Sequence, residues 1–318
     1  KECKTLNIDN DLCNGINDIL NEYITNEDKG VLTQLCVSIP IDGLCLKAFL
    51  NTINKTKYKK LKCLCFWGSN IGDIGCKYVG ELITNEYNKI SKLEIRDCNV
   101  TDKGCDMLSK YLLKHNRSFK HLQILRFDFN RFKNKGIYNI ACGLKYNSSL
   151  KCISFAFCDI TDSNELNDAL ILMLTTCNKL EELNLEGNQL TARGCVGIIT
   201  GLISLKSKTF STLNLCSNNI GEYLVDDDVQ ILHSLAQQFQ LTTSLKKIYL
   251  HGNFFDETIA DIFLLMLSNA KHISKLTVPH TLPVSKVTAI QTELQSHKPT
   301  TTAKKKAKTT KKKAKKKK

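Results

Sequence analysis

Apolar and polar positions follow one frame that recurs along this chain. In the segment LEELNLEGNQLTARGCVGI, which begins at Leu180, apolar residues fill slots one, four, six and eleven, and Asn188 fills slot nine. The same frame fits segments that begin at Leu61, Ile90, Leu122, Leu150, Phe210 and Leu245. Weaker copies begin near Cys3, Leu32 and Ile273. From Leu61 to Phe210 the starts are 28 to 32 residues apart, and the next gap is 35 residues. A pattern repeated at this period indicates stacked structural units.

Each copy predicts a short strand followed by a helix. Slots four and six alternate with the period of two that is typical of a strand. In most copies slot nine holds Asn or Cys, which can bond free backbone groups where the strand ends. After a turn that usually contains Gly, the period becomes that of a helix, as for Cys195, Ile198, Ile199 and Leu202. A single strand–helix unit cannot bury its apolar face alone, so the units must stack.

The pattern LxxLxLxx[N/C]xL, the long period and the Gly at the helix start resemble the ribonuclease-inhibitor-like class of leucine-rich repeats. The resemblance implies an α/β solenoid, or horseshoe, with a parallel β-sheet on the concave face and α-helices on the convex face. It also implies a reducing environment. We expect about nine to ten repeats over residues 1–283, a C-terminal cap or helical linker over 284–298, and a disordered Lys-rich tail over 299–318.

The cysteines favour an intracellular protein. There are 15, an odd number, spread along the chain without a CxxC or a Cys/His cluster at zinc spacing. Reduced thiols and a cytoplasmic location are therefore expected. A cytoskeletal, ciliary or nuclear location stays open. The longest apolar run, around Ile262–Leu267, is too short to span a bilayer.

The net charge of +14 belongs mainly to the C-terminal tail. Eleven lysines lie between Lys304 and Lys318, which leaves +3 for the rest of the chain (14 − 11). We expect this tail to bind a polyanion, such as an acidic protein tail (that of tubulin, for example) or RNA, or to act as a nuclear address. It contains no aromatic residue for base stacking, so sequence-selective nucleic-acid recognition is not expected.

Candidate partner-binding residues follow from the repeat frame, because slots three, five and seven point to the concave surface. They are Trp67, Glu94, Arg96, Arg126, Asp128, Glu182, Glu186, Tyr249 and His251. Trp, Tyr and Arg are frequent in binding hot spots. The alternative for Trp67, the sole tryptophan, is packing at the edge of the first strands. Phe129 and Phe157, in slot eight, are expected to border the same rim.

No cofactor, metal or catalytic site is predicted, because the sequence shows no nucleophile–base constellation, phosphate loop or dinucleotide motif. The chain also resembles Ran GTPase-activating proteins in architecture, which makes Arg131 and Arg193 candidates for a catalytic arginine. Arg193 lies in a turn equivalent to TDKG and KNKG, so we expect a solvated turn residue. The basic tail also differs from the acidic tail of that family.

The main functional hypothesis is a non-catalytic protein–protein interaction scaffold, in which the tail attaches to an acidic surface, within a large cytoskeletal or ciliary assembly. The alternatives are a Ran-type GTPase activator and a nuclear or ribonucleoprotein-associated factor. The insertion at residues 221–230 is expected to place Asp226–Asp228 at a helix start and to offer a contact loop.

Overall fold

The computed structural model describes residues 3–8, 22–24, 31–41, 43–114, 121–205, 208–222 and 226–297. The predicted Lys-rich tail, 299–318, lies outside these residues. The strands are β1 (Cys3–Ile8), β2 (Val31–Val37), β3 (Cys63–Trp67), β4 (Lys92–Arg96), β5 (Ile124–Arg126), β6 (Cys152–Ser154), β7 (Glu182–Asn184), β8 (Thr212–Asn214), β9 (Lys247–Tyr249) and β10 (Lys275–Thr277). The helices are α2 (Gly43–Lys55), α3 (Gly72–Ile83), α4 (Asp102–Lys114), α5 (Lys133–Gly143), α6 (Asn164–Thr176), the 3-10 turn η3 (Arg193–Cys195), α7 (Val196–Ser204), α8 (Asp226–Leu241), α9 (Glu257–Asn269) and α10 (Val284–Ser296).

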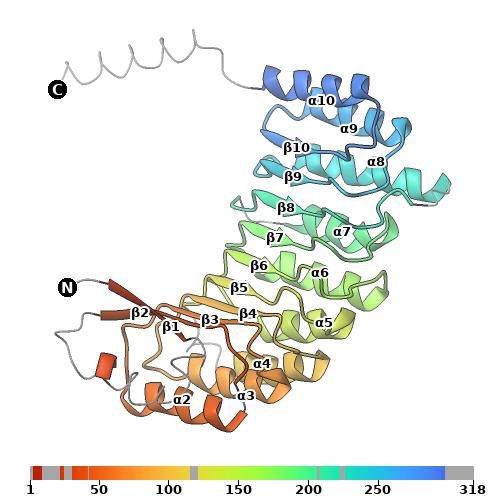
Figure 1. Ribbon diagram of the computed structural model, residues 1–318. Helices are drawn as coiled ribbons and strands as arrows, with labels where there is room; N and C mark the ends of the chain where they lie inside the picture. The colour runs from red at the N-terminus through yellow and green to blue at the C-terminus, as the bar shows by residue number, and fades with distance from the viewer. Residues whose placement is uncertain are drawn as a thin grey trace, which may run out of the picture.

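The strands form one ten-stranded parallel sheet in chain order, from β1 to β10. Figure 1 shows an open arc with the strands along its inner side and the helices along its outer side. Parallel neighbours require a crossover connection, and the helices from α2 to α9 provide those between β2 and β10. The predicted α/β leucine-rich-repeat solenoid is confirmed.

The core lies between the sheet and the helices, and the strand register builds it. Slot-four residues of successive strands are direct partners, so they form one continuous apolar row. This row includes Leu35, Leu64, Leu93, Leu125, Ile153, Leu183, Leu213 and Ile248. All of these side chains are fully buried. Stacking therefore supplies the burial that no single repeat could achieve.

Slot nine satisfies backbone groups where each strand ends, as predicted. The Asn130 Oδ1 accepts from the backbone N–H groups of Cys98 and Val100, both at 3.1 Å. Its Nδ2 donates to the carbonyls of Ile95 and Phe127 at 2.8 and 2.7 Å. Asn188 repeats the arrangement two strands later. Buried backbone groups without partners would be costly, so this slot tolerates few residue types.

Two of the turn glycines, Gly104 and Gly194, make room for a carboxylate from the preceding repeat. The Asp73 Oδ1 accepts from the backbone N–H groups of Thr101 and Gly104 at 2.8 and 3.0 Å. A Cβ added to Gly104 would lie 2.5 Å from that oxygen. Gly194 has the same relation to Asp162, at 2.1 Å. A larger residue would therefore push the helix start away from its neighbour.

Candidate functional site

The most exposed large hydrophobic side chain on the described strands is Trp67, at the end of β3. It is 57% exposed, and the Arg96 guanidinium lies 5.5 Å from the centre of its ring. Trp67 and Arg96 are direct partners in the β3–β4 register. A guanidinium over an indole face is an attractive pairing. The aromatic ring is thereby presented on the sheet surface together with a cation.

Glu94 lies beneath this surface, at 4% exposure, and organises the cations around it. Its Oε1 is 3.2 Å from the Lys92 ammonium and 3.5 Å from the Arg126 Nη1. Its Oε2 accepts from the Cys65 thiol at 3.0 Å. Burial alone would raise the pKa of Glu94, but the thiol hydrogen bond and the charges of Lys92 and Arg96 outweigh it and lower that pKa. Glu94 is therefore an ionised anchor.

Asp128 has the corresponding role for Arg96 and is equally buried, at 4% exposure. The Arg96 Nε lies 3.3 Å from its Oδ2. Its Oδ1 accepts from the Ser154 hydroxyl and, at 3.1 Å, from the Ala156 backbone N–H. Glu94 and Asp128, two of the predicted contact residues, therefore lie below the surface. They position Arg96 and Arg126, which are more accessible.

The other predicted contact residues lie further along the concave strands, away from this group. Glu182 and Glu186 are half-buried, and the Asn214 amide donates to Glu186 at 2.9 Å. The Tyr249 ring lies under the Lys275 ammonium at 4.7 Å. The His251 Nδ1 lies 2.9 Å from the Cys216 sulfur. The structure thus brings Trp67, Glu94, Arg96, Arg126 and Asp128 together as a "tryptophan cluster" on β3–β5, and keeps the other four apart from it.

The sequence frame puts Lys92, in slot three, on the same face as the tryptophan cluster, but it missed Cys36 as a neighbour of this cluster. Cys36 is the strand partner of Cys65, which is in turn the partner of Glu94. The hydrogen bond from Cys65 lowers the pKa of Cys36 to about 7. Cys36 belongs to the degenerate copy near Leu32, where the weaker pattern hides its strand slot. The cysteines of the described residues are free thiols.

The two arginines considered for GTPase activation differ in their surroundings. Arg193 is an exposed turn residue, and in addition its Nε lies 2.8 Å from the Asp228 Oδ1. Asp227 lies 4.0 Å from its Nη2. The acidic start of α8 is thus an ion-pair partner for η3 as well as a helix start. Arg131 lies exposed in the loop after β5.

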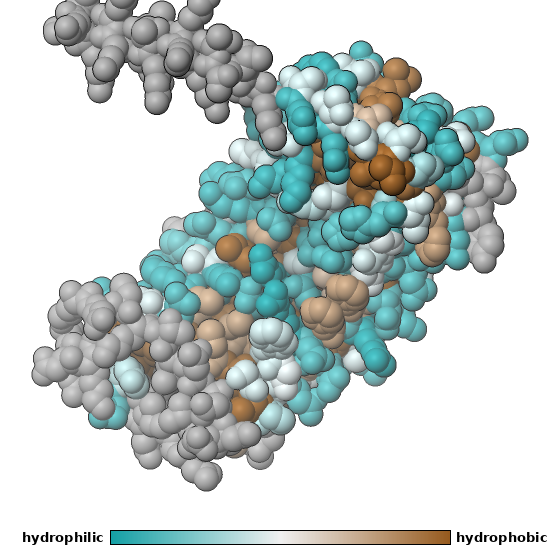
Figure 2. Space-filling view, turned by 45° about the horizontal axis from the view of Figure 1, so that its top comes forward, coloured by the Kyte–Doolittle hydropathy of each residue, from teal (hydrophilic) through white to brown (hydrophobic). Residues whose placement is uncertain are grey.

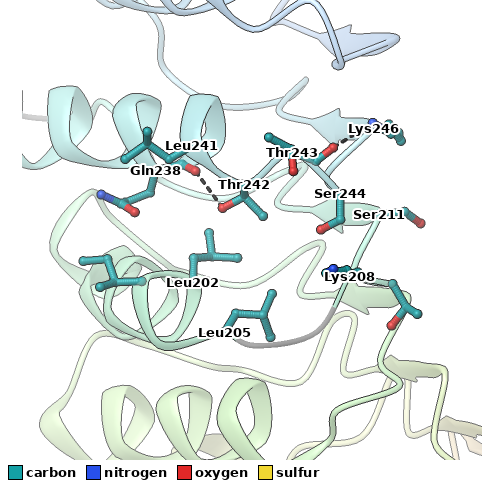
Figure 3. Close-up of a pocket in the computed structure, with 12 residues that line it drawn as sticks. Leu202, Leu205, Lys208, Ser211, Gln238, Leu241, Thr242, Thr243, Ser244 and Lys246 are labelled. Atoms are coloured by element: carbon teal, nitrogen blue, oxygen red, sulfur yellow. Dashed lines mark hydrogen bonds between the residues drawn. The ribbon is translucent and has the colours of Figure 1, made fainter.

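A cavity of about 1080 Å³ opens between the C-terminal ends of α7 and α8 (Figure 3). Leu202, Leu205 and Leu241 face it together with hydroxyl groups. The described residues that line it include no carboxylate, thiol or imidazole. The Lys246 ammonium at its edge donates to the Thr243 carbonyl at 2.7 Å. It is a gap between helices of unequal length rather than a reactive site.

The described residues on the face seen in Figure 2 are mostly hydrophilic, with separate hydrophobic patches among them. Among the described residues, no group of three or more His, Cys, Asp or Glu side chains is arranged to hold a metal ion. No helix in the described part of the chain is long and apolar enough to cross a membrane.

Sequence comparisons with known proteins agree with the leucine-rich-repeat pattern. The family model for the Leucine Rich repeat matches residues 88–109 and 176–198. The chain is 28% identical over 186 residues to a ribonuclease inhibitor of Mus musculus, which covers 58% of this chain and 37% of that protein. It is 25% identical over 179 residues to NACHT, LRR and PYD domains-containing protein 9C of Mus musculus, covering 56% of this chain and 17% of that protein. A crystal structure of a TLR13–ssRNA13 complex aligns with a TM-score of 0.45 and 14% identity, covering 79% of this chain and 33% of that one. The chain thus spans well under half the length of these relatives.

Fold and repeat pattern together define a leucine-rich-repeat solenoid. Within that class, the sequence of the chain is similar to those of ribonuclease inhibitors. Extended concave surfaces of this kind are typical of protein–protein interaction scaffolds.

Proposed function

We propose that this protein is a non-catalytic scaffold that binds a protein partner on its concave face, with the tryptophan cluster as the main contact. The exposed Trp67 ring beneath the Arg96 guanidinium carries this proposal. Aromatic and Arg side chains dominate binding energy in protein interfaces. Burying the exposed part of this ring would contribute about 3 kcal/mol at ~25 cal/mol per Å² of apolar area.

The buried carboxylates support binding by fixing the arginines in advance. The Arg96 Nε is anchored by Asp128, and Arg126 by Glu94. Side chains that are already ordered lose less rotamer freedom on association. Together with the neighbouring Lys92, the cluster carries three cations (Lys92, Arg96, Arg126) and two carboxylates, so the net charge of this surface is +1 (3 − 2). A complementary partner would present an apolar or aromatic anchor beside a carboxylate.

The Lys-rich tail would add attachment to an acidic surface. The eleven lysines of Lys304–Lys318 would attract a polyanion such as an acidic protein tail, tubulin or RNA. A place in a cytoplasmic, cytoskeletal or ciliary assembly is part of this proposal. A nuclear or ribonucleoprotein role is the alternative for the tail. If removal of Lys304–Lys318 left the localisation unchanged, that alternative would be excluded.

Affinity purification of the full chain, followed by binding measurements with the partner obtained, tests the concave-face proposal. Trp67→Ala and Arg126→Ala should each weaken binding about tenfold or more, which corresponds to ~1.4 kcal/mol. Leu265→Ala is the matched control, because Leu265 is a similarly exposed apolar residue on α9. Partner binding that survives both concave substitutions would reject the proposal.

A Ran-type GTPase activator is the second candidate. Its support is Arg131, which is exposed in a loop and makes no hydrogen bond or ion pair with other described residues. Arg193, by contrast, is engaged by Asp228. This function requires that the wild type stimulate GTP hydrolysis by Ran and that Arg131→Ala abolish the stimulation. If the wild type does not stimulate GTP hydrolysis, this candidate function is excluded.

A further inference from the structure

In each repeat from β3 to β9, the residue in slot eight, one to three residues after the end of the strand, has a positive φ. These slot-eight residues are Gly68, Asp97, Phe129, Phe157, Gly187, Ser217 and Gly252, with φ between 50° and 72°. Glycine adopts this conformation without steric cost, and Asp or Ser is small and polar. Phenylalanine is a poor choice for it, because a bulky side chain is strained there. Two neighbouring repeats nevertheless place Phe in this slot.

The two rings form an exposed stack at the rim of the sheet. The centres of Phe129 and Phe157 are 4.8 Å apart and their planes differ by 3°. Their exposed fractions are 50% and 41%. A Cβ added to Gly187 would lie 2.2 Å from the Phe157 ring, so the Gly187 backbone covers one face of that ring. The order of the repeats therefore leaves the outer face of Phe129 turned toward Asp97.

A cleft of about 610 Å³ opens beside this stack. It is lined by both rings, by the exposed carboxylates Asp97 and Asp159, and by Arg131. Neither carboxylate makes a side-chain hydrogen bond or ion pair with the described residues. Asp73 and Asp162, the carboxylates below the helix starts, are both bonded to backbone N–H groups. The cleft therefore combines an aromatic face with two uncommitted negative charges.

We propose that this rim cleft binds an arginine side chain of a protein partner. A planar guanidinium can stack on the Phe129 face and donate hydrogen bonds to Asp97, while Asp159 adds a second negative charge to the cleft. A nucleic acid would also stack on the ring, but the two carboxylates repel its phosphates. Arg131 contributes the single opposing charge, and its removal strengthens binding of a cation. This site is distinct from the tryptophan cluster, so it stands or falls separately from the proposed concave-face function.

The test uses the full chain with ring-labelled phenylalanine and two blocked tripeptides, Gly-Arg-Gly and Gly-citrulline-Gly. Citrulline has the shape of arginine without its charge. The arginine peptide should shift the Phe129 and Phe157 ring signals saturably in NMR titrations. The citrulline peptide should bind about tenfold more weakly, and Asp97→Asn with Asp159→Asn should cause a similar loss. Arg131→Ala should tighten binding of the arginine peptide.

Phe129→Gly removes the stacking face and is compatible with the positive φ of slot eight, because this slot is Gly in other repeats. It should abolish the peptide-induced shift of the Phe157 signal while circular dichroism remains that of the wild type. Equal affinity for the two peptides would overturn the proposal, and so would weaker binding by Arg131→Ala. A single-stranded oligonucleotide that shifts the same rings while the arginine peptide does not would overturn it in favour of a nucleic-acid ligand.

Discussion

Asn130 occupies slot nine of the repeat that begins at Leu122, and its replacement by alanine tests the backbone role assigned to that slot. The side chain is buried. Its Oδ1 is the acceptor for the N–H groups of Cys98 and Val100. Alanine removes this acceptor and leaves both donors buried between two repeats.

The expected loss follows from those two donors. A buried donor left without a partner costs about 1–3 kcal/mol, so two cost about 2–6 kcal/mol. Water that enters the vacated space would recover part of this, and we expect a loss of about 3 kcal/mol in the free energy of unfolding. Asn130→Cys is the matched variant, because the Cys98 sulfur is hydrogen-bonded to the backbone of Ser69 and Ile71 in the preceding repeat. It should lose about half as much, since sulfur is a weaker acceptor.

Equilibrium urea unfolding measures both variants, with far-UV circular dichroism for the whole solenoid. Fluorescence of Trp67, the sole tryptophan, reports separately on the early repeats. An unchanged dependence on urea concentration would show that the folded and unfolded states are otherwise comparable. The reasoning is refuted if Asn130→Ala loses less than about 1 kcal/mol, or if Asn130→Cys loses as much as alanine does.

Three further predictions concern surface and site residues. Phe129→Gly should change stability by less than about 1 kcal/mol in urea unfolding, because relief of the positive φ offsets the lost ring stack, whereas the buried Phe132→Ala should lose ~3–5 kcal/mol. Arg193→Ala should speed amide hydrogen exchange at the start of α8 and leave the global midpoint unchanged, because it removes the ion pair with Asp228; unaltered exchange there would contradict this. Because the fold lowers the pKa of Glu94, the ionised carboxylate stabilises the folded state at pH values above the ordinary pKa of 4.5, and this contribution is lost as the pH falls. The difference in free energy of unfolding between the wild type and Glu94→Gln should therefore shrink below about pH 4.5. A constant difference between these two proteins across that range would show that Glu94 is not held ionised.

The fold could be predicted from the sequence because each repeat has the same pattern of residue types. The apolar slots, the Asn or Cys of slot nine and the turn Gly each correspond to a local physical need, and the copies confirm one another. The ion pair between Arg193 and Asp228 could not be read in this way. It joins a turn to the one irregular insertion, so no other copy shows the pairing.

The sequence predicts which residues point to the concave side of the sheet, but not how exposed each of them is. Alternation along a strand says which side a residue points to, and the residues of slots three and five do lie on that side. Whether Glu94 or Asp128 is exposed depends on the length of the side chains in the two neighbouring strands. Arg96 and Arg126 reach across and cover them, which is a property of three strands at once. The same holds for the Phe129–Phe157 stack, because Gly187 in the repeat that follows covers one face of the Phe157 ring and so decides which face of the stack is accessible.

The tryptophan cluster and the rim cleft belong to the same few repeats, and Asp128 connects them. Its side chain anchors Arg96 on the concave face, and its carbonyl accepts from the Asp97 backbone N–H at 3.0 Å. The next residue is Phe129, which forms the aromatic wall of the cleft. A partner lying on β3–β5 could therefore contact both surfaces, and two linked contacts strengthen binding beyond either one alone. If one partner uses both surfaces, the double variant Trp67→Ala with Phe129→Gly should lose more affinity for it than either single variant does. Two independent partners would each lose affinity on only one of the two substitutions.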